Sequence, residues 1–254
     1  MFKSLPRPTI FAHRGASAHA PENTLAAFQL AVQHGAPVIE LDAKLCADGE
    51  VVVIHDQTVD RTTNGSGVVR QLPLAALREL DAGAKFDSKY IGEKIPTLNE
   101  VFEAVGRKLF INVEITNYAS PFDALPLKVA ELVKRHGLQD RVLFSSFIGL
   151  SLRRAHRITP KVPLGLLAFP GFKGSLARSF VGKLTPYQAL HPETGDVTPR
   201  LVGNAHRDGR RIHVYTVNDP EIMRRLFTWG VDGIFTDDPT LALQVLAESI
   251  DPQT

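Results

Sequence analysis

The stretch PVIELDAKLCADGEVVVIHD, residues 37–56, joins two apolar segments through a polar turn. Its pattern predicts a strand over residues 38–43, in which side chains two positions apart share one face of the sheet. Glu40 and Asp42 therefore point to the same side and repel each other, and a divalent cation would remove that repulsion. A second apolar strand over 51–54 brings His55 close to them. The stretch predicts a metal site with a titratable group beside it.

Outward from this stretch, strands alternate with helices along the chain. Strands are predicted at 9–12, 38–43, 109–115, 142–145, 162–167, 187–191, 212–217 and 233–236. Helices are predicted at 25–34, 73–80, 98–105, 124–136, 149–157, 198–208, 220–229 and 241–247, with a loop and a helix over 171–182. Eight strands alternating with helices in 254 residues predict a (β/α)8 TIM barrel. We expect a single domain over residues 1–254, with 57–107 as an insertion beside the active site.

Several polar residues fall at or just past the predicted ends of strands, where the catalytic groups of TIM barrels lie. They are His13, Glu40 with Asp42, Glu114, Ser145, Ser146, His191, Asn218 and Asp237. The strand ends of a barrel meet at one mouth, so we expect a functional site there.

The composition excludes several classes of protein. A net charge of +2 gives no basic surface for nucleic acid. Cys46 is the single cysteine, so no internal disulfide can form, which fits a reducing compartment. Prolines and charges interrupt the first fifteen residues where a signal peptide needs an apolar run, and no segment is apolar for long enough to cross a bilayer. We expect a cytoplasmic protein without stable membrane insertion.

An ordered set of motifs resembles the glycerophosphodiester phosphodiesterase family. The motifs are HRG at 13–15, PENT at 21–24, ELD and DG between 40 and 49, HD at 55–56, VE at 113–114, TVND at 216–219 and GVDGIFTDDP at 230–239. The resemblance covers residues 11–239 and implies a TIM barrel with a small insertion after the second strand. It also implies hydrolysis of a small glycerophosphodiester to sn-glycerol 3-phosphate and an alcohol, with one divalent cation as cofactor.

The resemblance implies that Glu40, Asp42 and Glu114 are the metal ligands. Three carboxylates without a thiolate suit Mg²⁺, Ca²⁺ or Mn²⁺ better than zinc. His13 and His55 match the catalytic pair of the family, and two imidazoles can deprotonate a nucleophile and protonate a leaving alkoxide. We expect His13 to be the base and His55 the acid, and the sequence is equally compatible with the reverse.

Further residues are expected at the substrate. Arg14 resembles the phosphate-binding arginine of the family, and its fork suits two phosphate oxygens. We expect Glu22 to position Arg14 or the substrate. Asn23 or Thr24 can cap the following helix, and we favour Asn23. Asn218 is either a polar contact to substrate or a turn or cap before the helix that starts at Pro220.

The chain departs from the family pattern at two positions. The usual Glu-x-Lys is Glu114-Ile115-Thr116 here, so a phosphate-neutralising lysine is missing. We hypothesise that Lys44, on the face of Glu40 and Asp42, or Lys85 in the insertion supplies the charge. A tryptophan before TVN is replaced by Tyr215, which keeps an aromatic wall with a polar tip.

Alternative functions stay open on the sequence. A lysophospholipase D-like enzyme would need an apolar channel, for which residues 166–172 and Phe180 offer material. A non-catalytic barrel that binds a phosphate metabolite would explain the missing lysine. The outer helices are compatible with a monomer or a homodimer.

Overall fold

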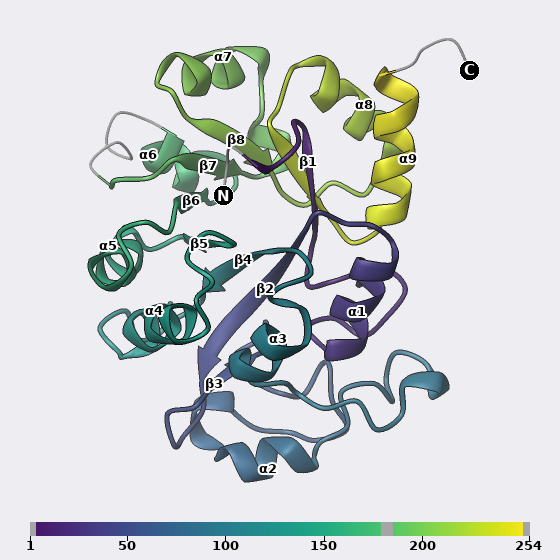
Figure 1. Cartoon of the computed structure of the whole chain (residues 1–254), viewed down its shortest axis with the longest axis vertical. Helices are drawn as coiled ribbons and strands as arrows, with labels where there is room; N and C mark the ends of the chain where they lie inside the picture. Colours follow the sequence, from purple (N-terminus) through teal and green to yellow (C-terminus); the bar gives the residue numbers. More distant parts are fainter. Residues whose placement is uncertain (1–3, 179–184, 251–254) are drawn as a thin grey trace.

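The computed structural model describes residues 4–178 and 185–250 and confirms the predicted TIM barrel (Figure 1). Within the described residues, eight parallel strands form a closed ring because β1 pairs with both β2 and β9. The ring consists of β1 (Thr9–Ala12), β2 (Val38–Leu45), β4 (Phe110–Ile115), β5 (Val142–Ser146), β6 (Leu164–Ala168), β7 (Ala189–Pro192), β8 (Arg211–Val214) and β9 (Gly233–Thr236). A further strand, β3 (Val51–Val53), pairs antiparallel with β2 outside the ring.

Helices cover the outside of the ring (Figure 1). They are α1 (Leu25–Gln33), α3 (Leu98–Val105), α4 (Leu125–Arg135), α5 (Gly149–Ile158), α6 (Ser175–Arg178), α7 (Pro199–Arg207), α8 (Pro220–Thr228) and α9 (Pro239–Ile250). The predicted helix over 171–182 runs partly beyond the described residues, and Phe180 lies outside them. No helix in the described part of the chain has the length and apolarity needed to span a bilayer.

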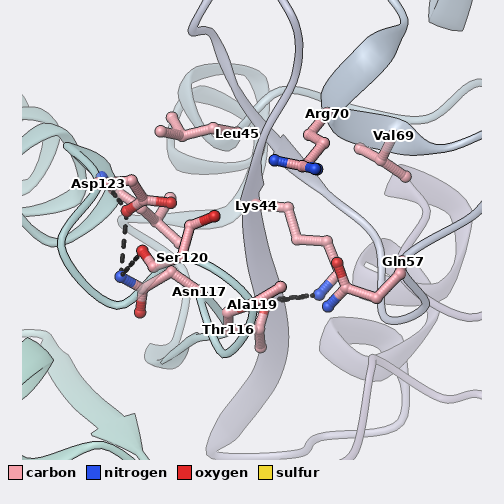
Figure 2. Close-up of a pocket in the computed structure, with 11 residues that line it drawn as sticks. Lys44, Leu45, Gln57, Val69, Arg70, Thr116, Asn117, Ala119, Ser120 and Asp123 are labelled. Carbon is pink, nitrogen blue, oxygen red and sulfur yellow. Dashed lines mark hydrogen bonds between the residues drawn. The ribbon is translucent and has the colours of Figure 1, made fainter.

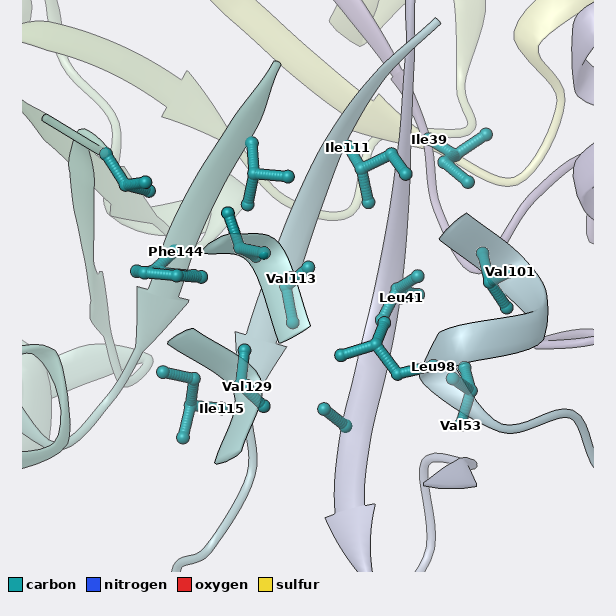
Figure 3. Packing of buried hydrophobic residues seen from close by; sticks show 14 of the residues in the cluster. Ile39, Leu41, Val53, Leu98, Val101, Ile111, Val113, Ile115, Val129 and Phe144 are labelled. Atoms are coloured by element: carbon teal, nitrogen blue, oxygen red, sulfur yellow. The ribbon is translucent and has the colours of Figure 1, made fainter. Parts of the chain in front are cut away.

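The apolar residues of β2 and β4 decide which face carries the acids. Leu41 of β2 and Val113 of β4 are fully buried and point outward, where they pack with Leu98 of α3 and Val129 of α4 (Figure 3). Burying one such side chain contributes about 1.5–3 kcal/mol. Alternation along the strands then directs the intervening carboxylates into the barrel.

Strand β2 is longer than predicted, and this corrects the position of its two acids. It continues to Leu45 because its last three residues pair with β3, with Ala43 opposite Val53. Glu40 and Asp42 therefore lie inside the strand and not at its end. They still reach the mouth, because β1 stops at Ala12 opposite Ile39 and β4 stops one residue after Glu114, the partner of Asp42.

The segment between β3 and α3 has a hydrophobic cluster of its own, which includes Val59, Val69, Leu77 and Ile95. It contains the short helix α2 (Leu74–Glu79). The helix α3 that follows packs in the outer layer of the barrel, in the same cluster as the strands. The boundaries 57–107 for an insertion, and a single domain over the whole chain, stay predictions.

Candidate active site

The loop after β1 is held in an unusual backbone conformation. Arg14 and Asn23 both have positive φ angles, 56° and 57°, although neither is glycine. Gly15 follows at φ 86°, and a Cβ there would lie 2.7 Å from the Cβ of Ala27. The backbone N–H of Asn23 donates to the carbonyl of Arg14 at 3.0 Å. Such strain persists only where the surroundings enforce it, and it occurs often at functional sites.

A cavity of about 200 Å³ opens at this loop. It is lined by residues from most strands of the barrel. They are His13, Arg14, Glu40, His55, Asn112, Glu114, Ser145, Phe147, Leu167, Tyr215, Thr216 and Phe235. The structure therefore brings together both predicted catalytic histidines, the predicted phosphate-binding arginine and two of the three predicted metal ligands, with the third, Asp42, beside them.

The three predicted ligands converge closely enough to hold one ion. One carboxylate oxygen from each of Glu40, Asp42 and Glu114 lies within 4.8 Å of the others. Burial, together with the charges of Asp42 and Glu114, raises the pKa of Glu40 well above its ordinary value. Burial and Asp42 raise the pKa of Glu114 to about 7. An all-oxygen donor set of this size fits Mg²⁺, Ca²⁺ or Mn²⁺, and such an ion would offset the repulsion.

Asp42 is kept ionised by its cationic neighbours. Burial alone would raise its pKa, but the charges of Arg14 and His55 and a hydrogen bond from Asn23 bring the pKa below its ordinary value. The Nδ2 of Asn23 donates to the Asp42 carboxylate at 2.9 Å. The prediction that Asn23 caps α1 is therefore wrong. Thr24 is the cap, because its hydroxyl accepts from the N–H of Ala27 at 3.2 Å.

Arg14 is fixed on both sides by acids. Its backbone N–H donates to Glu40 at 3.0 Å, and its NH1 donates to Glu22 at 2.9 Å. Its Nε lies 3.4 Å from a carboxylate oxygen of Asp42. Glu22 contacts Arg14 and does not line the cavity, and its role as a positioner stays a prediction.

Each predicted catalytic histidine carries an aspartate on Nδ1. His13 Nδ1 lies 2.6 Å from Asp237, and His55 Nδ1 lies 2.7 Å from Asp56. Burial would raise the pKa of Asp237, but the hydrogen bond with His13 helps to lower it to about 2. Hydrogen bonds from Arg61 and, to a smaller extent, from His55 lower the pKa of Asp56 to about 2. Both aspartates are therefore anions that orient the rings and leave Nε2 for chemistry.

Asn218 is hydrogen-bonded to Asp237, the partner of His13. Its Nδ2 donates to Asp237 at 2.6 Å, and its Oδ1 accepts from the N–H of Asp237 at 2.9 Å. It does not line the cavity. The alternative reading of Asn218 as a cap is wrong, because Asp219 caps α8 by accepting from the N–H groups of Glu221 and Ile222.

Lys44 lies two residues after Asp42 on β2, and it contacts Thr116, which occupies the position of the missing lysine. Its Nζ donates to the hydroxyl of Thr116 at 2.8 Å (Figure 2). Burial lowers the pKa of Lys44, while the charges of Asp42 and Glu114 raise it. Its side chain lines a second, smaller cavity of about 50 Å³ together with Thr116, and not the cavity that the histidines line. Lys85 is exposed and donates to the carbonyl of Asp60, so of the two proposed lysines only Lys44 lies near the carboxylates.

An aromatic wall forms the opposite side of the cavity. Tyr215 donates to the carbonyl of Ala168 at 2.7 Å, which fixes its ring. Phe147 meets Tyr215 edge-on at 6.1 Å between ring centroids and stacks on Phe169 at 4.1 Å. Tyr118 donates its hydroxyl to Glu114. The wall is suited to packing against the carbon face of a small polyol.

Some functional candidates were missed by the sequence reasoning. Asp56 follows His55 directly, and that adjacency was a signal. Tyr118 and Arg61 lie in irregular segments, where no sequence signal pointed to them. His191 was picked out at a strand end, but it is fully buried with His213 at 3.2 Å, and burial lowers its pKa to about 3. His191 is a neutral core residue outside the cavity.

Comparisons with known proteins agree with this geometry. Residues 13–241 match the model of the glycerophosphoryl diester phosphodiesterase family. The chain is 41% identical over 238 residues to a glycerophosphodiester phosphodiesterase of Caldanaerobacter subterraneus subsp. tengcongensis, covering 93% of this chain and 97% of that one. It is 36% identical to a glycerophosphodiester phosphodiesterase of Bacillus altitudinis, covering 94% and 98%.

Solved structures show the same similarity. A phosphodiesterase of Oleispira antarctica, determined in complex with the product sn-glycerol 3-phosphate, superposes with a TM-score of 0.88 at 31% identity, covering 97% of this chain and 98% of that one. A glycerophosphodiester phosphodiesterase of Agrobacterium tumefaciens superposes with a TM-score of 0.80 at 32% identity, covering 93% and 99%. The match over almost the whole chain, across a span that includes the cavity residues, shows that this chain belongs to the glycerophosphoryl diester phosphodiesterase family.

Proposed function

We propose that the chain hydrolyses glycerophosphodiesters to sn-glycerol 3-phosphate and an alcohol, using one divalent cation and two histidines. Family membership and the product-bound Oleispira antarctica relative support the reaction class. The observation that carries the proposal is the convergence of two aspartate-held imidazoles with three carboxylates, two of them buried and one partly buried, at one cavity.

Glu40, Asp42 and Glu114 would hold the cation, which supplies positive charge against the phosphoryl oxygens. Arg14 presents a guanidinium beside them, and its hydrogen bond to Glu22 and its ion pair with Asp42 hold that group in place. A guanidinium fork matches two phosphate oxygens. These groups together hold the diester with its phosphorus between the two histidines.

His13 and His55 carry the two proton transfers in this mechanism. Nδ1–H of each ring donates to its aspartate, so Nε2 of His13 is free to accept a proton from the nucleophile. Nε2–H of His55 donates a proton to the alcohol oxygen as its bond to phosphorus breaks. Attack by water reaches the products with these two transfers. Attack by a hydroxyl of the substrate's glycerol uses them to expel the alcohol and form a cyclic phosphate, which water then opens to sn-glycerol 3-phosphate with the roles of the two histidines exchanged.

Lys44 takes the place of the family lysine in this proposal. Its ammonium reaches the side chain of Thr116 from the neighbouring strand and so carries positive charge to the edge of the carboxylate cluster. Tyr215 packs against the glycerol, Glu22 positions Arg14, and Asn218 positions Asp237. Cytoplasmic location, and a monomer or a homodimer, stay predictions.

The test is release of sn-glycerol 3-phosphate from diesters of ethanolamine, choline, serine, glycerol and inositol. We expect release with Mg²⁺, Ca²⁺ or Mn²⁺ present and none after chelation. Binding of these diesters without turnover in any metal would favour the non-catalytic barrel and contradict the proposal. Turnover that persists in excess chelator would contradict its metal dependence.

One observation supports a lysophospholipase D-like activity as a second candidate. The stack of Phe147 on Phe169 leads out of the cavity, and Phe172 on the same loop is 93% exposed. An acyl chain on the glycerol could pack along these rings. Comparing turnover of lysophosphatidylethanolamine with that of glycerophosphoethanolamine separates the two activities.

A further inference from the structure

A series of five ionisable side chains links two residues that line the cavity, His55 and Arg14, and Arg61 is its centre. Nε and NH2 of Arg61 donate to the two carboxylate oxygens of Asp56 at 2.7 and 3.2 Å. NH1 and NH2 donate to Glu22 at 2.6 and 2.9 Å. Asp56 holds His55, and Glu22 holds Arg14. The Arg61 guanidinium therefore connects the predicted catalytic His55 with the predicted phosphate-binding Arg14.

The backbone around Arg61 is ordered by hydrogen bonds of its own. Thr63 is fully buried, and its hydroxyl donates to the carbonyl of Val59 at 2.8 Å. The carboxylate of Asp60 accepts from the N–H of Gly67 at 3.0 Å. The turn that carries Arg61 is therefore fixed to the hydrophobic cluster of the segment between β3 and α3, which includes Val59.

Arg14 and His55, at the two ends of this series of contacts, depend on Arg61 to different extents. Arg14 has contacts with Asp42 and Glu40 besides Glu22, so it keeps its place without Arg61. The side chain of Asp56 has hydrogen bonds only from Arg61 and His55 among the described residues. The His55 side chain is itself 42% exposed, so little packing holds its ring. Loss of Arg61 would release Asp56 and with it the orientation of His55.

We propose that Arg61 is a positioning residue for the hydrolysis assigned above: it clamps Asp56 on Nδ1 of His55 and thereby keeps Nε2 of His55 directed into the cavity. The inference rests on the proposed function for its consequence in turnover. The proposal also gives the segment between β3 and α3 a role in the active site, because Arg61 belongs to that segment. The planar fork is needed, since a lysine ammonium cannot bond two carboxylates in two bidentate pairs.

The test compares Arg61→Gln and Arg61→Lys with Arg78→Gln. Arg78 is a matched control, because it lies in the same segment and pairs with Glu100 at 2.9 Å, away from the cavity. We expect Arg61→Gln to lower kcat on glycerophosphoethanolamine about 10- to 100-fold, part of the usual contribution of a general acid or base. KM, and inhibition by sn-glycerol 3-phosphate, should change by less than about threefold, because Arg14 stays in place. Arg61→Lys should recover little, and Arg78→Gln should leave kcat unchanged.

A double-variant comparison separates positioning from general damage. In an Asp56→Asn background, Arg61→Gln should cost no further activity, because the carboxylate that Arg61 clamps is gone. Losses that multiply in the double variant would overturn the proposal, as would equal losses for Arg61→Gln and Arg78→Gln. Weaker inhibition by sn-glycerol 3-phosphate with unchanged kcat would also overturn it.

A second measurement needs no turnover and so stands apart from the proposed function. Nitrogen-15 NMR of the histidine rings should show a proton held on Nδ1 of His55 and hydrogen-bonded to Asp56 in the wild-type protein and in Arg78→Gln, so that tautomer here means only that Nδ1 keeps its proton whether or not Nε2 is protonated. Arg61→Gln should lose this fixed tautomer. If the wild-type protein releases no sn-glycerol 3-phosphate, the proposed function fails while this result still decides the clamp. An unchanged His55 signal in Arg61→Gln would refute the clamp.

Discussion

Replacing Lys44 with methionine tests whether this lysine substitutes for the one missing at Thr116. The change keeps most of the aliphatic stem and removes the ammonium that donates to Thr116 at 2.8 Å. Lys44 is only 5% exposed, and burial lowers its pKa, so the fold pays to keep a cation there. We therefore expect the free energy of unfolding of Lys44→Met to equal or exceed that of the wild-type protein.

The expected loss of activity follows from the contact that Lys44 would make. A hydrogen bond from a charged group to phosphate contributes about 1.5–3 kcal/mol. Because about 1.4 kcal/mol corresponds to tenfold in rate, kcat/KM should fall roughly 10- to 150-fold. A simple Coulomb energy of about 4 kcal/mol for two charges 4 Å apart near the surface sets the upper bound.

The assay is kcat/KM for glycerophosphoethanolamine in saturating metal, together with thermal unfolding. Lys85→Met is the control, because Lys85 is the other lysine proposed from sequence and its ammonium bonds the carbonyl of Asp60 outside the cavity. It should retain wild-type kcat/KM. The exchange Lys44→Thr with Thr116→Lys returns the lysine to the family position and should restore most of the activity that Lys44→Met loses.

Three results would contradict the reasoning. Activity of Lys44→Met within about threefold of the wild type would show that the ammonium does not act on the phosphate. Failure of the exchanged variant to regain activity, with the fold intact, would show that Lys44 acts from its own place and not as a replacement. Reduced thermal stability of Lys44→Met would contradict the argument that this lysine is kept at a cost to the fold.

Three further predictions concern the rest of the site. His13→Ala and His55→Ala should each lower kcat by at least about 100-fold without unfolding the protein, and ordinary activity in either variant would remove that histidine from the mechanism. Chelation should abolish turnover and added Mg²⁺, Ca²⁺ or Mn²⁺ should restore it, whereas Glu114→Gln should stay inactive at metal concentrations that saturate the wild type. Burial would raise the pKa of Asp237, but its interactions with His13, Asn218 and Ser17 together lower it from 3.8 to about 2, so its ionised form stabilises the fold above pH 3.8 and the contribution is lost as the pH falls towards 2. Asp237→Asn should therefore lower the free energy of unfolding by about 1–2 kcal/mol at pH 6, discounted for partial exposure, and by less near pH 2.5 in urea titrations; an equal difference at both pH values would contradict this sign.

Sequence periodicity was sufficient to predict the barrel and the orientation of its acids. Period-two alternation placed Glu40 and Asp42 on one face, and the structure shows the apolar residues between them packed outward against α3 and α4. The end of β2 was predicted too early. Its last residues are stabilised by pairing with β3, a contact between strands that periodicity within one strand does not report.

The supports of the site were harder to predict because they depend on contacts between distant segments. Asp237 is 224 residues from His13, and Arg61 is 39 residues from Glu22. Asn23 looked like a cap because its residue type and position before a helix favour one. Its left-handed backbone turns the side chain to Asp42 instead, and Thr24 takes the cap.

Several charged groups at the mouth of the barrel destabilise the fold. Glu40 and Glu114 have raised pKa values because burial and mutual repulsion disfavour their anions, and Lys44 has a lowered pKa because burial disfavours its cation. Apolar residues would satisfy the same positions at less cost, since buried charges are expensive without well-placed partners. Such groups persist in one cavity when they act on something that the fold alone does not contain. A cation for the acids and a phosphate for Arg14 and Lys44 together balance these charges, and a glycerophosphodiester bound with its metal provides both.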